Sequence, residues 1–326
     1  MVLVYFVVGF ALIFSFLNGF HDSGNILTTV IFSRAMSPRT ALAMTIAAEF
    51  AGPFLFGVAV AKTIGEELVL PQAIDNWVLV AALTSVIFWI LFSRRFGIPS
   101  SSSHALAGGL IGAITAQAGF QAIQAAGLWK VILALFVAPV LGLLIGFLFT
   151  KLVFLLAKKS SMKINNFFKK GQIVTALGLA LSQGSNDAQK TMGVIILSLV
   201  VAGKISSFEV PTWVVTSSAL AIASGTAFGG WRLIRTLGGK FFKIKPVHGF
   251  TAQITSTAII LSAALWGGPV STTQVVGLSV LGAGSAQRIK MVRWGEARNI
   301  LLSWILTLPI MVFLSWGTYY LFRLFS

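Results

Sequence analysis

Cysteine is absent from this sequence, and acidic residues are scarce. With 0 Cys, the chain can form no disulfide, cysteine-ligated zinc site or iron–sulfur cluster. Charged residues make up 10% of the 326 residues and hydrophobic residues 56%, whereas a soluble domain carries about 25% charged residues. So few charges cannot solvate the surface of a fold of this length. We therefore expect an all-α polytopic membrane protein.

Ten apolar stretches approach the ~20 residues that a helix needs to cross a bilayer. The first has no basic leading segment and no small-residue cleavage site, which predicts a retained span and not a signal peptide. The first and sixth are long and carry polar interruptions, while the fourth and ninth are short and begin with Ser or Thr runs. We expect broken helices or re-entrant hairpins at these polar motifs. The ten stretches are 1–33, 40–61, 77–93, 100–117, 128–150, 171–201, 211–230, 248–265, 271–286 and 299–322.

The basic residues are unevenly distributed. Lys and Arg number 24 against 8 Asp and Glu, which gives a net charge of +16. Of these 24, 19 lie in alternate loops, after the first, third, fifth, seventh and ninth stretches. Because basic loops remain on the cytoplasmic side, this pattern predicts a multi-pass protein of the cell's inner (plasma) membrane with both termini outside. The excess of base therefore does not indicate nucleic-acid binding.

Two polar motifs recur in order along the chain. Residues 19–25 (Gly-Phe-His-Asp-Ser-Gly-Asn) correspond to 184–190 (Gly-Ser-Asn-Asp-Ala-Gln-Lys), and 97–104 correspond to 267–274. Each half holds five stretches, and an odd number inverts the second half relative to the first, as in secondary transporters. The predicted division is a first transmembrane repeat at 1–157, a basic cytoplasmic linker at 158–170 and an inverted repeat at 171–326.

Three carboxylates fall inside apolar stretches, at Asp22, Glu49 and Asp187, and Lys190 lies near the last of them. Ionisable groups inside a membrane are costly and usually mark a substrate or ion pathway. Asp22 and Asp187 occupy matching places in the two repeats, which favours a functional role. Glu49 has no acidic counterpart, so a structural, protonated carboxyl is the alternative for it. Lys190 either belongs to the site or only neutralises Asp187.

Runs of hydroxyl side chains follow Pro99 and Pro269, at 100–103 and 271–273. Proline favours helix starts and Ser or Thr caps them, so each run is expected to open a half-helix. Its free N–H groups would attract an anion; ordinary capping is the alternative. Nearby carboxylates repel an anion unless cations or protons intervene, which predicts co-transport of an anion with a cation. A carboxylate accepts a hydrogen bond from protonated phosphate but not from sulfate, which weakly favours phosphate.

These motifs resemble those of the PiT family of inorganic phosphate transporters over nearly the whole chain. Residues 18–25 and 184–193 resemble its two signatures, which are relatives of Gly-Ala-Asn-Asp-Val-Ala-Asn. Residues 97–104 and 268–273 resemble its paired Pro-x-Ser elements. The resemblance implies an inverted-repeat fold, alternating-access symport of inorganic phosphate with Na⁺ or H⁺, and homodimers. It implies no cofactor, apart from bound Na⁺ ions.

The motifs, together with the resemblance, predict roles for individual residues. His21 and His104 adjoin the motifs and are either proton carriers or structural histidines. Gln253 stands where many members have Glu, which leaves the number of coupling cations open. The candidate substrate-binding residues are Ser101, Ser102, Ser103, Ser271, Thr272, Thr273 and Lys190. The candidate cation-binding residues are Asp22, Asn25, Asn186, Asp187 and Glu49.

Three other functions fit the sequence less well than phosphate symport. A symporter of sulfate or another tetrahedral oxyanion is the nearest alternative, because its site chemistry is similar. An anion channel is disfavoured by the paired carboxylates in the path. An enzyme is not expected, because the sequence has no nucleophile elbow and no pair of His at metal-binding spacing on one helix.

Overall fold

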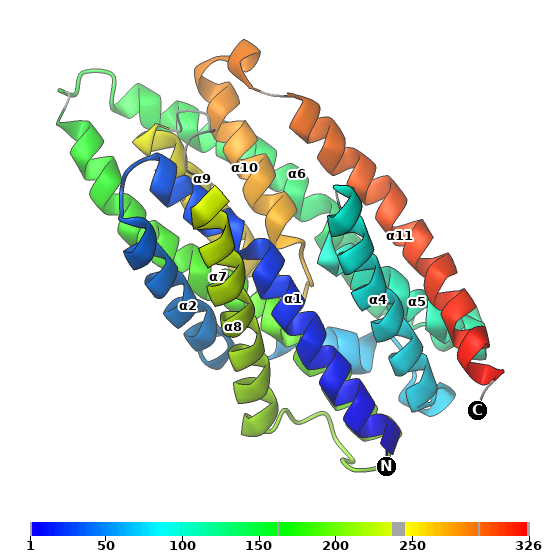
Figure 1. Ribbon diagram of the computed structural model, residues 1–326. Coiled ribbons are helices and arrows are strands. Elements are labelled where there is room, and N and C mark those ends of the chain that lie inside the picture. The colour runs from blue at the N-terminus through cyan, green and yellow to red at the C-terminus, as the bar shows by residue number, and fades with distance from the viewer. Residues whose placement is uncertain (1, 99, 162, 237–244, 293, 325–326) are drawn as a thin grey trace.

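The structure is a computed structural model that describes residues 2–98, 100–161, 163–236, 245–292 and 294–324 (Figure 1). Each of the ten apolar stretches is helical there. A π-helical turn (Thr63–Glu67) follows α3, and short 3₁₀ turns precede α4, α6 and α11. The helices are α1 (Val2–Phe32), α2 (Pro38–Leu55), α3 (Ala59–Lys62), α4 (Asn76–Phe96), α5 (Ser102–Ala118), α6 (Ala125–Leu156), α7 (Ile164–Val201), α8 (Thr212–Thr236), α9 (Pro246–Trp266), α10 (Thr272–Gln287) and α11 (Trp294–Arg323).

The outer surface of the bundle is apolar. Large apolar side chains are exposed along α6, among them Leu133, Val137, Leu144 and Leu148, as expected for a face that meets lipid. Among the described residues, 5 helical segments are long and apolar enough to cross a bilayer, and α2 with α3 makes a sixth that is bent by 67°. The chain is therefore a multi-pass membrane protein, as predicted.

The two halves of the chain run in opposite directions. Ser33, just after α1, donates to Gln172 near the start of α7 (2.6 Å), so the two helices that open the halves lie antiparallel. The packing is paired in the same way: α1 packs on α8 and α7 on α2, while α5 packs on α11 and α10 on α6. Exchanging the halves maps each of these pairs onto the other, which is the arrangement expected for inverted repeats.

Two helical hairpins meet inside the molecule (Figure 1). Helices α4 and α9 each end at a left-handed glycine, Gly97 (φ 66°) and Gly267 (φ 91°), and the chain turns back into α5 and α10. At the two tips, the Ser101 hydroxyl donates to the Ser271 hydroxyl (2.9 Å). The link after α4 therefore turns back as a hairpin tip, with Ser101 against the second hairpin, while Arg95, Gly97 and Ile98 on the link are exposed.

The signature motifs do not break their helices. Helix α1 is continuous through residues 18–25, and α7 is continuous through 184–193. The interruptions lie instead at the two hairpin tips and between α2 and α3, where Gly57 adopts a φ of 74°. A polar side chain leaves the backbone of its own helix intact when groups on other helices supply its hydrogen bonds. The polar side chains of these motifs bond to other helices in this way.

Glycines allow the paired helices to approach closely. A Cβ at Gly225 of α8 would lie 2.0 Å from the carbonyl oxygen of Phe16 in α1, and one at Gly184 of α7 would lie 2.4 Å from that of Glu49 in α2. No larger residue fits at either crossing without moving backbone.

The predicted linker at 158–170 is partly helical, because α7 already begins at Ile164. Both termini lie at the same end of the molecule, and the basic loops after α6 and α10 lie toward the opposite end (Figure 1). The division into repeats at 157 and 171 stays a prediction.

Candidate functional site

The hairpin tips place two hydroxyl runs face to face. Ser101 caps α5, because its Oγ accepts from the backbone N–H of His104 (3.3 Å) while the hydroxyl donates to Ser271. The next two residues also reach across. Ser102 donates to Oδ1 of Asn18 in α1 (2.5 Å), and Ser103 donates to the carbonyl oxygen of Val270 (2.9 Å). The helix starts that were expected from the Pro and Ser pattern are thus present and adjacent.

The two motif carboxylates meet at the start of α10. The Thr272 hydroxyl lies 3.2 Å from Oδ2 of Asp22 and 3.1 Å from Oδ2 of Asp187, and the Thr273 hydroxyl donates to Oδ1 of Asp22. One hydroxyl proton cannot serve both carboxylates at once, so Thr272 marks the point where they converge. Both aspartates are buried, at 5% and 1% exposure.

Lys190 is surrounded by acceptors. Its Nζ donates to Oδ1 of Asp187 (2.6 Å), to the Ser103 hydroxyl (2.6 Å) and to the Val270 carbonyl (2.7 Å). An ammonium group has three donors, and all three are used. In this conformation Lys190 therefore neutralises Asp187 and ties α7 to both hairpins; contact with a substrate would require this arrangement to open.

The two asparagines of the predicted cation set lie on either side of this cluster. Asn25 donates to the Thr273 hydroxyl (3.3 Å), and Asn186 donates to the carbonyl oxygen of Gly268 (3.1 Å). The Oδ1 of Asn186 and the Oε1 of nearby Gln183 are buried without a hydrogen-bond partner among the described residues. Unpaired amide oxygens next to carboxylates are suitable ligands for a hard cation such as Na⁺.

Glu49 lies behind Asp22 and not beside it. Its carboxylate accepts from Gln183 Nε2 (3.2 Å) and from the Thr226 hydroxyl. Gln183 also approaches the backbone carbonyl of Asp22 (3.4 Å), and Thr226 approaches that of Gly19 (3.2 Å), so both partners of Glu49 reach the motif of α1. The described residues contain no group of three or more His, Asp or Glu side chains arranged to hold a metal ion.

The remaining candidates have separate surroundings. His104 is buried, with Nδ1 3.0 Å from the Ser101 hydroxyl and its ring edge-on to Phe136. His21 is an exposed side chain of α1. Gln253 of α9 donates to Thr29 and accepts from Thr175, with no hydrogen bond to either motif aspartate.

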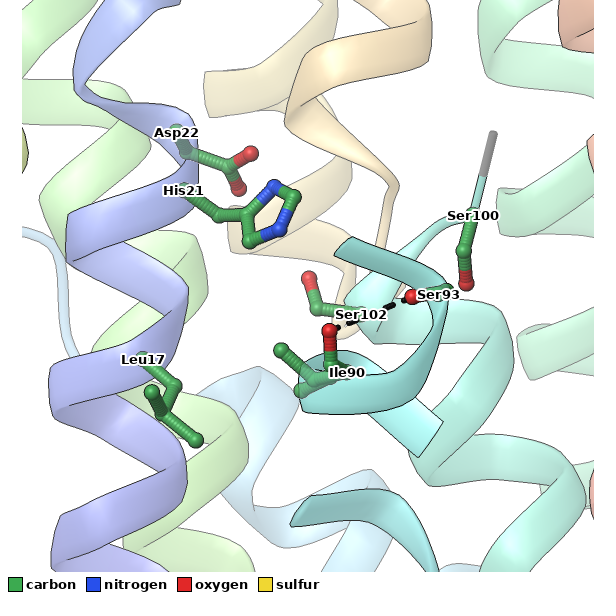
Figure 2. Close-up of a pocket in the computed structure, with 7 residues that line it drawn as sticks. All are labelled: Leu17, His21, Asp22, Ile90, Ser93, Ser100 and Ser102. Carbon is green, nitrogen blue, oxygen red and sulfur yellow. Dashed lines mark hydrogen bonds between the residues drawn. The ribbon is translucent and has the colours of Figure 1, made fainter. Parts of the chain in front are cut away.

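A small cavity reaches the central cluster from α1 and the first hairpin. Figure 2 shows His21 pointing from α1 toward this hairpin, with Asp22 beside it. The cavity measures about 10 Å³, which is the space of about one water molecule. A tetrahedral oxyanion enters only if the hairpin tips move apart. The lining residues are Leu17, His21, Asp22, Ile90, Ser93, Ser100 and Ser102.

Sequence reasoning missed three residues that hold the site together. Gln183 and Thr226 support Glu49, and Asn18 accepts from Ser102. Gln183 directly precedes the second signature and Asn18 opens the first, so their positions were a usable signal. Thr226 lies outside both motifs, and only the packing of α8 against α1 and α2 reveals it.

Buried ionisable groups where two internal hairpins meet, inside an apolar helical shell, define a membrane transport protein. The chain belongs to the phosphate transporter family, whose model matches residues 18–315. Members of this family are transporters and not enzymes, which confirms the prediction from the sequence.

Relatives match over almost the full length. A probable low-affinity inorganic phosphate transporter of Bacillus subtilis (strain 168) is 41% identical, over 99% of this chain and 98% of the relative. A protein of the same description from Rhizobium meliloti (strain 1021) is 41% identical, over 95% and 93%. A solved structure described as the sodium-dependent phosphate transporter superposes with a TM-score of 0.90 at 24% identity, covering 100% of both chains. At that identity the match shows the fold.

Proposed function

We propose that this chain imports inorganic phosphate by symport with a cation, through alternating access of its two halves. The observation that carries the proposal is the convergence of Asp22 and Asp187 on Thr272, at the start of a hydroxyl-rich helix. A helix start with free N–H groups favours an oxyanion. Lys190 balances the charge of Asp187, but the carboxylate of Asp22 at the same point repels an anion. Phosphate therefore binds well only after a cation has reduced this repulsion.

This mutual dependence is a thermodynamic coupling: each ligand raises the affinity of the other by the same factor. We assign the hydroxyls of Ser101–Ser103 and Ser271–Thr273 to phosphate. We assign Asp22, Asn25, Asn186, Asp187 and Glu49 to the cation side, and Lys190 to the border between the two. Unpaired amide oxygens and carboxylates favour Na⁺ as the coupling ion, and the fold shared with a sodium-dependent phosphate transporter supports this choice.

Relatives described as inorganic phosphate transporters support phosphate over other oxyanions. We place the protein in the plasma (inner) membrane with both termini outside, on the distribution of basic loops. A homodimer is a further expectation, and the molecular mass of the purified protein in detergent tests it.

The experiment is uptake of labelled phosphate into proteoliposomes with Na⁺ and pH gradients imposed separately. Accumulation above the equilibrium level under an inward Na⁺ gradient is expected. Accumulation under a pH gradient alone would assign the coupling to H⁺. Equilibration at the same rate without any gradient would indicate an anion channel, and inhibition by excess sulfate equal to that by phosphate would make the substrate a general tetrahedral oxyanion.

A further inference from the structure

A second, larger cavity lies next to the central cluster and belongs to none of the assigned residue sets. Its volume is about 250 Å³, far above the ~10–15 Å³ that one water molecule needs, so it has room for a small oxyanion. We call this cavity the arginine vestibule. The residues that line it include Phe20, His21, Ser23, Arg94, Gly229 and Arg232.

The vestibule carries positive charge. Arg94 comes from the end of α4 and Arg232 from the last two turns of α8, and both line this cavity. Arg94 is held against the wall, with its guanidinium carbon 4.0 Å above the centre of the Phe20 ring. Among the described lining residues there is no Asp or Glu. Each guanidinium group is a planar fork of N–H donors that suits the oxygens of a phosphate group.

The vestibule adjoins the central site. His21 lines both the vestibule and the small cavity that reaches Asp22. The vestibule lies beside the C-terminal halves of α1 and α8, and so toward the end of the molecule where the basic loops gather. An anion that leaves the hairpin tips in this direction meets the two arginines next.

We propose that Arg94 and Arg232 form a second phosphate-binding site, which holds the anion on its way between the central site and the basic end of the transporter. The proposal rests on the proposed function, and it adds a site that the hydroxyl runs and carboxylates do not supply. A site of this kind raises the local concentration of the anion and speeds its transfer. His21 separates the two sites.

The absence of cysteine from the chain provides a direct test. In His21→Cys, the single thiol faces the vestibule, and its modification is measured on purified protein in lipid-free detergent with anionic and cationic methanethiosulfonate reagents. The anionic reagent should react at least ~10-fold faster than the cationic one, since a positively charged cleft raises the on-rate of anions by that order. Inorganic phosphate should slow the modification.

Removing the guanidinium groups tests whether they form the site. In the His21→Cys background, the further substitutions Arg94→Gln and Arg232→Gln should abolish the preference for the anionic reagent. They should also raise the phosphate concentration needed to protect the thiol roughly tenfold per arginine. Arg95→Gln is the matched control, because Arg95 is exposed, precedes the same hairpin tip and does not line the vestibule. It should leave both measurements unchanged.

Several outcomes would overturn the proposal. One is equal protection of the thiol by phosphate in the arginine variants and in the parent, and another is no reaction of the thiol with either reagent. A third is protection that appears only when phosphatidylglycerol is added, which would make the ligand a lipid headgroup. Labelled phosphate uptake by the wild-type protein is measured in parallel. If uptake fails while the arginine-dependent protection persists, the proposed function is wrong and the anion site remains.

Discussion

At the scale of single residues, the site sets two aspartates with different neighbours side by side. Asp187 is paired with a buried lysine, whereas Asp22 is held by hydroxyls of the second hairpin. The charge of Asp187 is already balanced in this conformation, and that of Asp22 is not. Asp22 is therefore the carboxylate whose charge is most available to an incoming cation.

Replacing Asp22 by Asn tests this difference. The amide keeps the shape of the side chain and one acceptor for Thr273, but it removes the charge that would bind a cation. We expect Asp22→Asn to reduce gradient-driven phosphate uptake in proteoliposomes to background, with an unchanged melting temperature. Asp75→Asn is the control: Asp75 caps α4, and Asn caps a helix equally well, so uptake should persist. Wild-type uptake by Asp22→Asn would remove Asp22 from the cation site.

Lys190 and Asp187 should behave as one unit in stability. Removing one partner of a buried ion pair leaves an uncompensated charge and costs about 3–5 kcal/mol. We expect Lys190→Met and Asp187→Asn each to lower the melting temperature, and the double variant Lys190→Met/Asp187→Asn to be no less stable than either. Additive losses in thermal unfolding of the purified protein would show that the two side chains do not act as a pair.

At the scale of helices, the sequence predicted where most helices lie and that Asp22, Glu49 and Asp187 are inside the bundle, where they are buried. The hydroxyl runs that follow Pro99 and Pro269 correctly predicted where α5 and α10 begin, because Ser101 and Ser271 are the N-cap residues of these helices. The motif around Asp22 was expected to break its helix and does not. Its side chains are satisfied by α10 and by the first hairpin, from parts of the chain more than 80 residues away, and such long-range pairing leaves no local signal.

The crossing of α1 and α8 depends on one glycine. A Cβ at Gly225 would lie 2.0 Å from the Phe16 carbonyl oxygen and 2.8 Å from the Phe20 nitrogen, so the two helices must separate. We expect Gly225→Ala to lower stability by ~1–3 kcal/mol, the usual cost of overpacking. Gly9→Ala is the control, because nothing lies within 4 Å of its Cβ position and Ala is the better helix former.

Thermal unfolding of the two glycine variants distinguishes close packing from helix propensity. The melting temperature is expected to fall for Gly225→Ala and not to fall for Gly9→Ala. If both variants were as stable as the parent, the close approach of α1 and α8 at this crossing would be incorrect, and the position of Thr226 beside Glu49 would need revision.

At the scale of the whole molecule, the small central cavity implies motion. Two hairpins from opposite halves close over Asp22 and Asp187 and leave the space of about one water, while the arginine vestibule opens beside them. Hydrogen bonds at the tips, and the contacts of Ser103 with Lys190 and Val270, link the halves in this closed state. Transport requires these contacts to break, because phosphate cannot reach the hydroxyl runs otherwise.

Joining the tips covalently should therefore stop transport. The Ser101 and Ser271 oxygens are 2.9 Å apart, close enough for a disulfide of about 2.05 Å after a small adjustment. No native thiol competes, since the chain has 0 Cys. We expect oxidised Ser101→Cys/Ser271→Cys to take up no phosphate and to recover uptake on reduction, with each single variant insensitive to oxidant.

Because both serines are also proposed phosphate ligands, the rate of disulfide formation is a second measurement. This rate should fall when Na⁺ and phosphate are added together, as the tips separate around the substrate. Full uptake by the fully cross-linked protein would show that the tips stay together during transport.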